Sequence, residues 1–418
     1  MKCKTILMMA LLSLTSQLFA QDLYVGGDIS LLQQYDDYGV SYYDHQGRPI
    51  SDVLTYMKSE AVGWNAQRVR LFVNPNPALE YNDPAVCQDL AYVARLGKRI
   101  KDAGFAFMLD FHYSDVWADP AKQWTPTAWL SLNDTELQTK IYEYTRDCLT
   151  KLVEAGATPD FIQTGNEISY GMLWGEKGAG SNRCYINSDD NWPRFIALLQ
   201  QAGKACREVC PQAKIVIHTE RNGQPDVLRG IYERLTSVDY DVIGLSYYPF
   251  WHKGLSTLSE SLNMLATVFP DKKVQIVETA YYYQWQPQVG NGIDYDFSST
   301  WPATAEGQVS FVRDLVAELK KHSNVNALYW WFPEENGTGP DKAVIGGWLN
   351  RGLWDNNTHC ALPALYELKS FFDGRTGIAS VMADMDDSKW YTLRGVCLDS
   401  CPAFPGIYVR NRQKVAVR

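Results

Sequence analysis

The sequence predicts a (β/α)8 TIM barrel, an α/β fold in which eight parallel strands close into a ring and each strand is followed by a helix. Over its 418 residues the chain alternates short apolar runs with longer amphipathic stretches. The apolar runs, such as Phe105 to Leu109 and Val242 to Leu245, are nearly continuous, as expected of parallel strands covered on both faces. Eight strand–helix pairs follow one another, which is the number that this barrel requires.

Taken in order, the predicted strands span residues 23–30, 66–73, 105–111, 160–166, 214–219, 241–247, 273–279 and 326–332. The predicted helices lie between them, at about residues 50–61, 85–103, 134–155, 192–208, 224–235, 257–268, 304–322 and 363–373. A doubly wound sheet is the alternative. It is disfavoured because Gly26-Gly27 alone does not make a glycine-rich phosphate turn after the first strand.

The segments that follow the strands are long after the third, fourth, seventh and eighth strands. In a (β/α)8 barrel these segments meet at the face where active sites are built. We therefore expect their aromatic side chains to line a cleft rather than fill the core. The tryptophans in these segments are Trp117, Trp124, Trp129, Trp174, Trp285, Trp301, Trp348 and Trp354.

Two glutamates end predicted strands and carry the expected chemistry. Glu167 follows Asn166 at the end of the fourth strand, and Glu278 ends the seventh. These two strands lie across the barrel opening, so both carboxyl groups can reach one glycosidic bond. The pair therefore predicts a retaining glycosidase, with Glu167 as the acid/base and Glu278 as the nucleophile. A structural ion pair is the alternative for either residue taken alone.

Other polar residues at strand ends are expected to support this pair. Arg70 is predicted to hold Glu278 ionised by a charge-assisted hydrogen bond. Tyr247 is expected to hydrogen-bond the nucleophile, and Asn166 to donate to a sugar 2-hydroxyl.

Asp110 and His112 close the third strand and are expected to orient the site. Asp28 is expected either to reach a sugar hydroxyl or to cap a turn. No His-x-His pair follows the first strand, so metal-dependent hydrolysis is not expected.

The first 20 residues have the pattern of a secretory signal. Lys2 and Lys4 precede an apolar stretch, and Leu18-Phe-Ala20 is a plausible cleavage site before Gln21. The stretch is too short and too interrupted by Ser and Thr to span a membrane. Export to the periplasm, cell surface or extracellular space is therefore expected. Loss of the two lysines moves the net charge from −9 to −11, which disfavours nucleic acid as a partner.

Residues 21–373 are expected to form the barrel, and residues 374–418 a short β-rich extension. The extension resembles C-terminal sorting segments of proteins exported by the type IX route. A β-ribbon packed on the barrel is the other interpretation. Of the nine cysteines, Cys397 and Cys401 are the most credible disulfide pair, whereas a bridge between Cys206 and Cys210 on one helix would be strained.

Several motifs together resemble glycoside hydrolase family 53, the retaining endo-β-1,4-galactanases. The resemblance runs from about residue 24 to 373, and the stretch Leu109-Asp-Phe-His-Tyr-Ser-Asp-Val-Trp-Ala-Asp-Pro120 is highly specific. The other motifs are Gly27-Asp-Ile-Ser, Val69-Arg-Leu-Phe-Val-Asn-Pro, Thr164-Gly-Asn-Glu-Ile, Gly171-Met-Leu-Trp, Ile243-Gly-Leu-Ser-Tyr-Tyr-Pro-Phe-Trp-His and Ile276-Val-Glu-Thr-Ala-Tyr.

The resemblance implies a (β/α)8 barrel, Glu167 as acid/base and Glu278 as nucleophile. It implies β-1,4-galactan of pectic type I arabinogalactan, and its galacto-oligosaccharides, as substrate. Trp117, Trp251 and Trp331 are the aromatic residues expected at the substrate. A monomer without a catalytic cofactor is expected.

Two departures from the family leave questions open. Bacterial members often carry a calcium-binding loop after the nucleophile strand. Here that loop has only Asp294 and Asp296 as candidate ligands for a structural calcium. The segment after Trp330-Trp-Phe-Pro-Glu-Glu also differs, which leaves the number of sugar subsites open. A hydrolase of mannan or cellulose, or a non-catalytic glycan-binding protein, are the functional alternatives.

Overall fold

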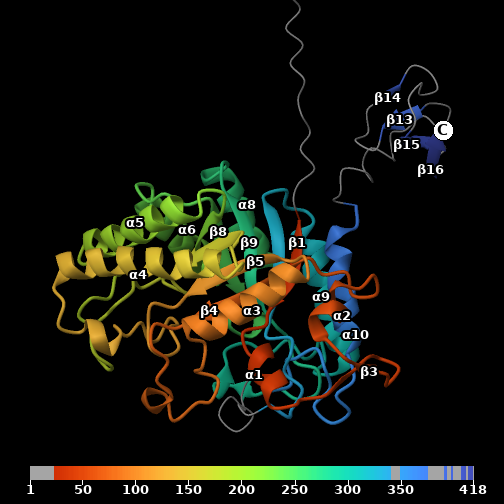
Figure 1. The fold of residues 1–418 in the computed structure, drawn as a ribbon, viewed down its shortest axis with the longest axis horizontal. Coiled ribbons are helices and arrows are strands. Elements are labelled where there is room, and N and C mark those ends of the chain that lie inside the picture. Colours follow the sequence, from red (N-terminus) through yellow and green to blue (C-terminus); the bar gives the residue numbers. More distant parts are fainter. Residues whose placement is uncertain are drawn as a thin grey trace, which may run out of the picture. The chain divides into compact units, whose positions relative to one another are not determined.

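The computed structural model describes residues 23–339 and 349–374, together with four short strands between residues 390 and 417. Residues Leu23–Phe371 form one compact unit. Its centre is a closed barrel of parallel strands in the order β1-β12-β9-β8-β7-β6-β5-β4, which confirms the predicted fold class (Figure 1). The barrel strands are β1 (Tyr24–Asp28), β4 (Ala66–Leu71), β5 (Ala106–Phe111), β6 (Phe161–Thr164), β7 (Lys214–Thr219), β8 (Val242–Tyr247), β9 (Lys273–Thr279) and β12 (Val325–Trp331).

Helices follow the strands close to the predicted positions and cover the outside of the barrel (Figure 1). Capping side chains fix the starts of several of them, as in the capping box of Asn133 and Glu136 at the first turn of the longest described helix. The main helices are α2 (Val53–Lys58), α3 (Leu90–Asp102), α4 (Asp134–Glu154), α5 (Trp192–Val209), α6 (Pro225–Arg234), α8 (Leu255–Val268), α9 (Ala305–Leu319) and α10 (Pro363–Glu367). The last predicted helix is shorter than expected, because the chain continues after α10 as the 3-10 turn Leu368–Phe372.

The segments between strands and helices contain short elements that the sequence did not predict. They are α1 (Leu32–Asp37), α7 (Pro249–His252), the strand pairs β2 (Tyr42–Tyr43) with β3 (Pro49–Ile50) and β10 (Gln288–Val289) with β11 (Gly292–Ile293), and 3-10 turns at Pro77–Leu79, Thr127–Trp129 and Arg221–Gly223. Elements of two to six residues are too short for a hydrophobic period to show.

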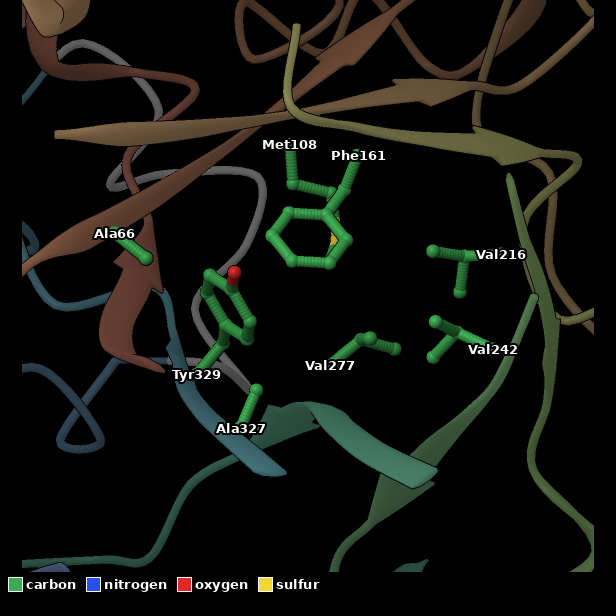
Figure 2. Close-up of a cluster of buried hydrophobic side chains, with 8 residues drawn as sticks. All are labelled: Ala66, Met108, Phe161, Val216, Val242, Val277, Ala327 and Tyr329. Atoms are coloured by element: carbon green, nitrogen blue, oxygen red, sulfur yellow. The ribbon is translucent and has the colours of Figure 1, made fainter. Parts of the chain in front are cut away.

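The part of the barrel interior nearer the amino ends of the strands is filled by apolar side chains, which alternate along each strand with outward-facing residues. Figure 2 shows this cluster, in which side chains from strands all around the barrel meet. Its members are Ala66, Met108, Phe161, Val216, Val242, Val277, Ala327 and Tyr329, all at most 4% exposed.

Two residues further along several of these strands, the inward positions become polar. On β4 the residue two positions after Ala66 is Arg68. The corresponding residues are Asp110 after Met108 on β5 and His218 after Val216 on β7. Because side chains on one face of a strand recur every second residue, these groups form a layer directly above the apolar cluster. The change from apolar to polar layers marks the end of the barrel that holds the candidate site.

Strand β9 contains one residue more than its neighbours at its carboxyl end. Ile276 pairs with Leu245, and the next pairing on β8 joins Ser246 to Glu278, so that Val277 is passed over. The pairing with β12 also advances by one extra residue on β9 in this stretch. This β-bulge lets Val277 face the apolar cluster while Glu278, the next residue, also faces the barrel interior.

Phe372 and the residues after it belong to a second unit. Within that unit β14 (Cys397–Leu398), β13 (Trp390–Thr392), β15 (Gly406–Arg410) and β16 (Gln413–Val417) form an antiparallel sheet in this order. The predicted signal, residues 1–20, and Cys401 of the predicted disulfide lie outside the described residues. Cys206 and Cys210 are both free thiols. Within the described part of the chain no helix is long and apolar enough to cross a membrane.

Candidate active site

Glu167 and Glu278 line one cavity of about 650 Å³ at the carboxyl ends of the barrel strands. Glu167 follows β6, and Glu278 lies on β9, with β7 and β8 between them. The structure therefore brings the two predicted carboxyl groups into the same space. Further lining residues include Asp28, Arg68, Arg70, Tyr81, His112, Trp117, Asp119, Asn166, Glu220, Arg221, Tyr248, Trp251, His252, Asp294, Tyr295 and Trp331.

The backbone that presents Glu167 is unusual. Gly165 has φ 107°, and a Cβ there would lie 2.7 Å from Cγ2 of Ile168, so this position requires glycine. Glu167 itself has φ 48°, a left-handed conformation that costs a residue other than glycine about 1–3 kcal/mol. Its backbone N–H donates to Nδ1 of His218 at 3.3 Å, which helps to hold the strained turn.

Glu278 is held by a cation and a hydroxyl. Nη1 of Arg68 lies 3.0 Å from Oε1 of Glu278, and Oη of Tyr248 donates to Oε2 at 2.9 Å. Both contacts favour the ionised carboxylate, because each donor interacts more strongly with a negative charge. Glu278 is therefore prepared to act as an anion.

Arg68 lies at the centre of the polar layer and is 1% exposed. Its guanidinium contacts Asp28 at 2.7 Å and Asp110 at 2.8 Å besides Glu278, and it donates to Oδ1 of Asn166 at 2.8 Å. These carboxylates raise the pKa of Arg68 despite its burial. Because the guanidinium is paired with three carboxylates, it stays protonated and is held in place from several directions.

The surroundings of the two glutamates separate their proton affinities. Burial raises the pKa of Glu167 well above its usual range, and the nearby carboxyl groups of Glu278 and Glu220 raise it further. Burial also raises the pKa of Glu278, but Arg68 opposes this effect. We conclude that a single proton shared by the pair resides on Glu167, which leaves Glu278 ionised.

A third carboxyl group lies near Glu167. Glu220 follows β7 and is 6% exposed; its Oε1 accepts from Oγ of Ser169 at 2.6 Å and contacts Nε of Arg221 at 2.9 Å. Its other oxygen, Oε2, is buried without a hydrogen-bond partner. Sequence reasoning missed Glu220, although its place directly after a barrel strand was the same signal that identified Glu167.

Two predicted contacts to Glu278 are wrong in detail. The contact predicted for Arg70 is made by Arg68, because Arg70 turns toward the segment after its strand. Nε of Arg70 donates to Gln88 at 3.2 Å, and its guanidinium lies 4.2 Å from the centre of the Trp117 ring.

The hydrogen bond predicted for Tyr247 is made by Tyr248. Inward positions on β8 alternate from Val242 through Ser246, so Tyr247 faces outward and donates to the carbonyl of Lys253 at 3.1 Å. The sequence contains both tyrosines, and only the strand register distinguishes them.

The remaining supporting residues lie close to the predicted positions. Nε2 of His112 lies 3.1 Å from Asp110, and Nδ1 accepts from the N–H of Ala118 at 3.0 Å, so Nε2 carries the proton in the neutral ring. Asp28 caps a turn through Ser30 and pairs with Arg68, so both of its oxygens are occupied. The structure thus supports the turn-cap alternative for Asp28.

Asn166 lines the cavity, but one Nδ2 hydrogen already donates to the carbonyl of Ala118 at 2.8 Å. The contact to a sugar 2-hydroxyl stays a prediction, and the second Nδ2 hydrogen of Asn166 would be its donor.

The loop aromatics divide between the cavity and the interior. Trp117, Trp251 and Trp331 line the cavity, as expected. The prediction that the loop tryptophans line a cleft is wrong for four others, which are at most 3% exposed and pack in the interior: Trp129, Trp174, Trp301 and Trp354. Trp348 lies outside the described residues.

The candidate calcium ligands are not assembled into a metal cage. Asp294 lines the cavity, whereas Oδ1 of Asp296 accepts from Gln286 and from the N–H of Ser298, each at 2.8 Å. Calcium takes six to eight oxygen ligands. Among the described residues no group of three or more His, Cys, Asp or Glu side chains could hold a metal ion, so these two residues do not by themselves fit a calcium site.

Comparisons with known proteins agree with this geometry. The sequence model described as glycosyl hydrolase family 53 matches residues 24–368. The chain is 37% identical to the "uncharacterized protein in bgaB 5′ region" of Niallia circulans, over 74% of this chain and 84% of the relative. It is 31% identical to the arabinogalactan endo-β-1,4-galactanase of Cellvibrio japonicus, over 84% of this chain and 86% of the relative. The Ignisphaera aggregans GH53 catalytic domain superposes with a TM-score of 0.72 at 31% identity, covering 83% of this chain and 96% of that domain.

Proposed function

The chain belongs to glycosyl hydrolase family 53, and we propose that it is an exported endo-β-1,4-galactanase that cleaves galactan with retention of configuration. The observation that carries the proposal is the asymmetry of the two glutamates in one cavity. Glu278 has a cation and a hydroxyl on its oxygens, whereas Glu167 is surrounded by other acids. The sugar is proposed from relatives named arabinogalactan endo-β-1,4-galactanase.

In the first step, protonated Glu167 donates its proton to the glycosidic oxygen while the bond from that oxygen to the anomeric carbon breaks. The Glu278 carboxylate attacks the same carbon and forms a glycosyl ester. Arg68 and Tyr248 hold Glu278 ionised and oriented for this attack. The galactan fragment on the leaving side of the bond then departs with a new hydroxyl group.

In the second step, the Glu167 carboxylate takes a proton from water, and the resulting hydroxide attacks the anomeric carbon. Glu278 departs as a carboxylate, again stabilised by Arg68. Two inversions give net retention. The scheme uses two carboxyl groups and water, so it needs no cofactor.

The test compares the wild type with Glu278→Gln on galactan, mannan and carboxymethylcellulose. We expect the wild type to release reducing sugar from galactan, and the variant to lose turnover while still binding the polymer. Glu334→Gln is a matched control: Glu334 is fully buried outside this cavity, and its Oε1 accepts from the N–H of Leu31 at 2.9 Å, a hydrogen bond that a glutamine oxygen can also accept. It should keep full activity.

The outcomes separate the alternatives. If the wild type releases no sugar from galactan, the proposed substrate is contradicted. Release from mannan or cellulose instead identifies the alternative hydrolase for that polymer. Binding without turnover in the wild type would identify a glycan-binding protein. Proton NMR of the earliest products should show the β-anomer first; α-anomer first would contradict the double displacement.

Export is part of the proposal and has its own test. The basic and apolar pattern of residues 1–20 supports cleavage before Gln21. Mass spectrometry of the protein released by its producing cells should find Gln21 at the amino terminus. Intact chains from Met1 retained inside the cells would contradict export. Removing residues 374–418 should block surface delivery if this extension is a sorting segment, and should leave delivery unchanged if it is a structural ribbon.

A further inference from the structure

His218 and Ser246 form a buried hydrogen-bonded pair close to Glu167. Nε2 of His218 lies 2.8 Å from Oγ of Ser246, and both residues are fully buried. Neither residue lines the catalytic cavity, so each can act on the reaction only through another residue. His218 lies on β7, between β6, which leads into Glu167, and β8, which carries Ser246. The pair therefore links three neighbouring strands at the carboxyl end of the barrel.

His218 also holds the strained turn at Glu167 through two consecutive backbone groups. The N–H of Glu167 donates to Nδ1 of His218 at 3.3 Å, and the N–H of Ile168 donates to the carbonyl oxygen of His218 at 3.0 Å. Glu167 is the residue with φ 48° in this turn. The position of the Glu167 carboxyl group thus depends on His218, although the ring does not reach the cavity.

The surroundings of His218 keep its ring neutral. Burial and the nearby charge of Arg68 lower the pKa of His218 well below its usual range. His112 and His252 act in the same direction, and Asp110 opposes them. A neutral imidazole carries one N–H, so one ring nitrogen donates and the other accepts.

The contacts of Nδ1 show which nitrogen is the acceptor. Two donors face Nδ1 of His218: the N–H of Glu167 at 3.3 Å and Nε2 of Gln163 at 3.0 Å. Oδ1 of Asn166 also lies 3.0 Å from Nδ1, but this oxygen already accepts from Arg68 at 2.8 Å. We therefore assign Nδ1 as the acceptor and place the proton on Nε2, since the partner of one ring nitrogen sets the protonation of the other.

This tautomer sets the direction of the Ser246 hydroxyl. Because Nε2–H of His218 donates to Oγ of Ser246, the one hydroxyl hydrogen remains for a different acceptor. Burial and the charge of Glu278 raise the pKa of Glu167, and a hydrogen bond from the Ser246 side chain opposes this rise. The hydrogen bonds thus run in one direction, from His218 through Ser246 to the Glu167 carboxyl group.

We propose that His218 and Ser246 are positioning residues for Glu167: the ring orients the hydroxyl, which donates to one carboxyl oxygen and leaves the catalytic proton on the other. The inference rests on the proposed function, since it takes Glu167 as the proton donor. The hydroxyl also stabilises the carboxylate that forms when Glu167 gives up its proton. Ser246 therefore makes Glu167 a stronger acid in the first step.

The first experiment measures kcat, KM and the pH profile of kcat/KM on galactan for the wild type and Ser246→Ala. Without the hydroxyl the Glu167 carboxylate loses a donor, so Glu167 keeps its proton to higher pH and the basic limb should move to higher pH. We expect kcat to fall about tenfold with KM nearly unchanged, because the lost hydrogen bond does not touch the substrate. The acids that raise the pKa of Glu167 remain in the variant, namely Glu278, Glu220 and Asp119.

Thr145→Val is the matched control. It removes another fully buried hydroxyl, which lies 2.8 Å from Oη of Tyr113 and outside the cavity. This change should leave kcat and the basic limb in place. A second measurement needs no active variant: nitrogen NMR of histidine-labelled wild type should find the His218 ring protonated at Nε2, its signals being identified by their loss in His218→Gln.

The outcomes distinguish the two proposals. A basic limb that stays in place or moves to lower pH in Ser246→Ala overturns the positioning role while the galactanase proposal stands, and so does a His218 ring protonated at Nδ1. If the wild type cleaves mannan or cellulose but not galactan, the substrate proposal fails and the same pH profiles on that polymer decide the positioning role. A wild type that cleaves none of these polymers overturns both.

Discussion

Nη1 of Arg68 lies 3.0 Å from Oε1 of Glu278, and the same guanidinium is shared with Asp28 and Asp110. The candidate nucleophile is therefore one member of a buried group of charges rather than half of a simple pair. Breaking a buried group of this kind is costly, because the remaining charges lose their compensation.

Arg68→Lys is expected to impair both charge control and stability. Lysine keeps the charge but cannot reach three carboxylates at once, so Glu278 loses part of the effect that lowers its pKa. The acidic limb of the pH profile of kcat/KM should move to higher pH, with a loss of about tenfold to a hundredfold. In Arg70→Lys the acidic limb should stay in place; equal movement in both variants would restore the role first predicted for Arg70.

Tyr248→Phe and Tyr247→Phe form a matched pair on adjacent residues. The first removes the hydroxyl that donates to Glu278, and should lower kcat by about tenfold to a hundredfold. The second removes a hydrogen bond to the carbonyl of Lys253, and should cost about 1 kcal/mol of stability with little change in kcat. Steady-state kinetics and thermal unfolding of the two variants check this, and a larger kcat loss in Tyr247→Phe would show that the assignment is reversed.

Glu220→Gln is expected to move the basic limb of the pH profile of kcat/KM to lower pH. Glu167 must be protonated to act as the acid, and Glu220 is one of the groups that raise its pKa, together with Glu278 and Asp119, while the Ser246 hydroxyl lowers it. Removing the Glu220 charge makes the proton of Glu167 easier to lose. Glu220→Asp keeps the charge and should restore the limb. An unmoved basic limb in Glu220→Gln would show that this carboxyl group does not act on Glu167.

Glu167→Gln should be inactive but more stable than the wild type at neutral and alkaline pH. The folded-state pKa of Glu167 is raised above its unfolded value. The folded protein therefore binds more protons than the unfolded chain between these two values, and wild-type stability falls as pH rises through this window. Glutamine does not titrate, so the difference in unfolding temperature should grow from pH 4 to pH 8. A constant difference across this range would contradict the assigned pKa shift.

Much of the fold is predictable from the sequence because both faces of each barrel strand are covered. Their apolar runs are therefore continuous, and the predicted limits of β7 and β9 match the structure at both ends. Glu167 and Glu278 could be found because each ends such a run. The short strand pair β10–β11 gave no comparable signal.

The residues that hold Glu278 could not be identified in the same way. Arg68 and Arg70 lie on the same face of one strand, and which of them reaches Glu278 depends on contacts with Gln88 and Trp117. Tyr248 was missed because Tyr247, the residue before it, is the last residue of the strand and was predicted to make the contact. The loop tryptophans were overpredicted for a related reason: a residue's place in a loop does not reveal whether the loop folds back over it, as at Trp174 and Trp354.

The bulge in β9 has a consequence for the two residues that follow Ile276. Without the extra residue, only one of Val277 and Glu278 could follow Ile276 on the inward side of the strand. Pairing of Val277 with Ser246 in regular register would turn the carboxylate toward the surrounding helices. Deletion of Val277 would keep Glu278 opposite Ser246 but would remove a side chain from the apolar cluster. The bulge thus lets one short stretch of strand both fill the barrel and carry the candidate nucleophile.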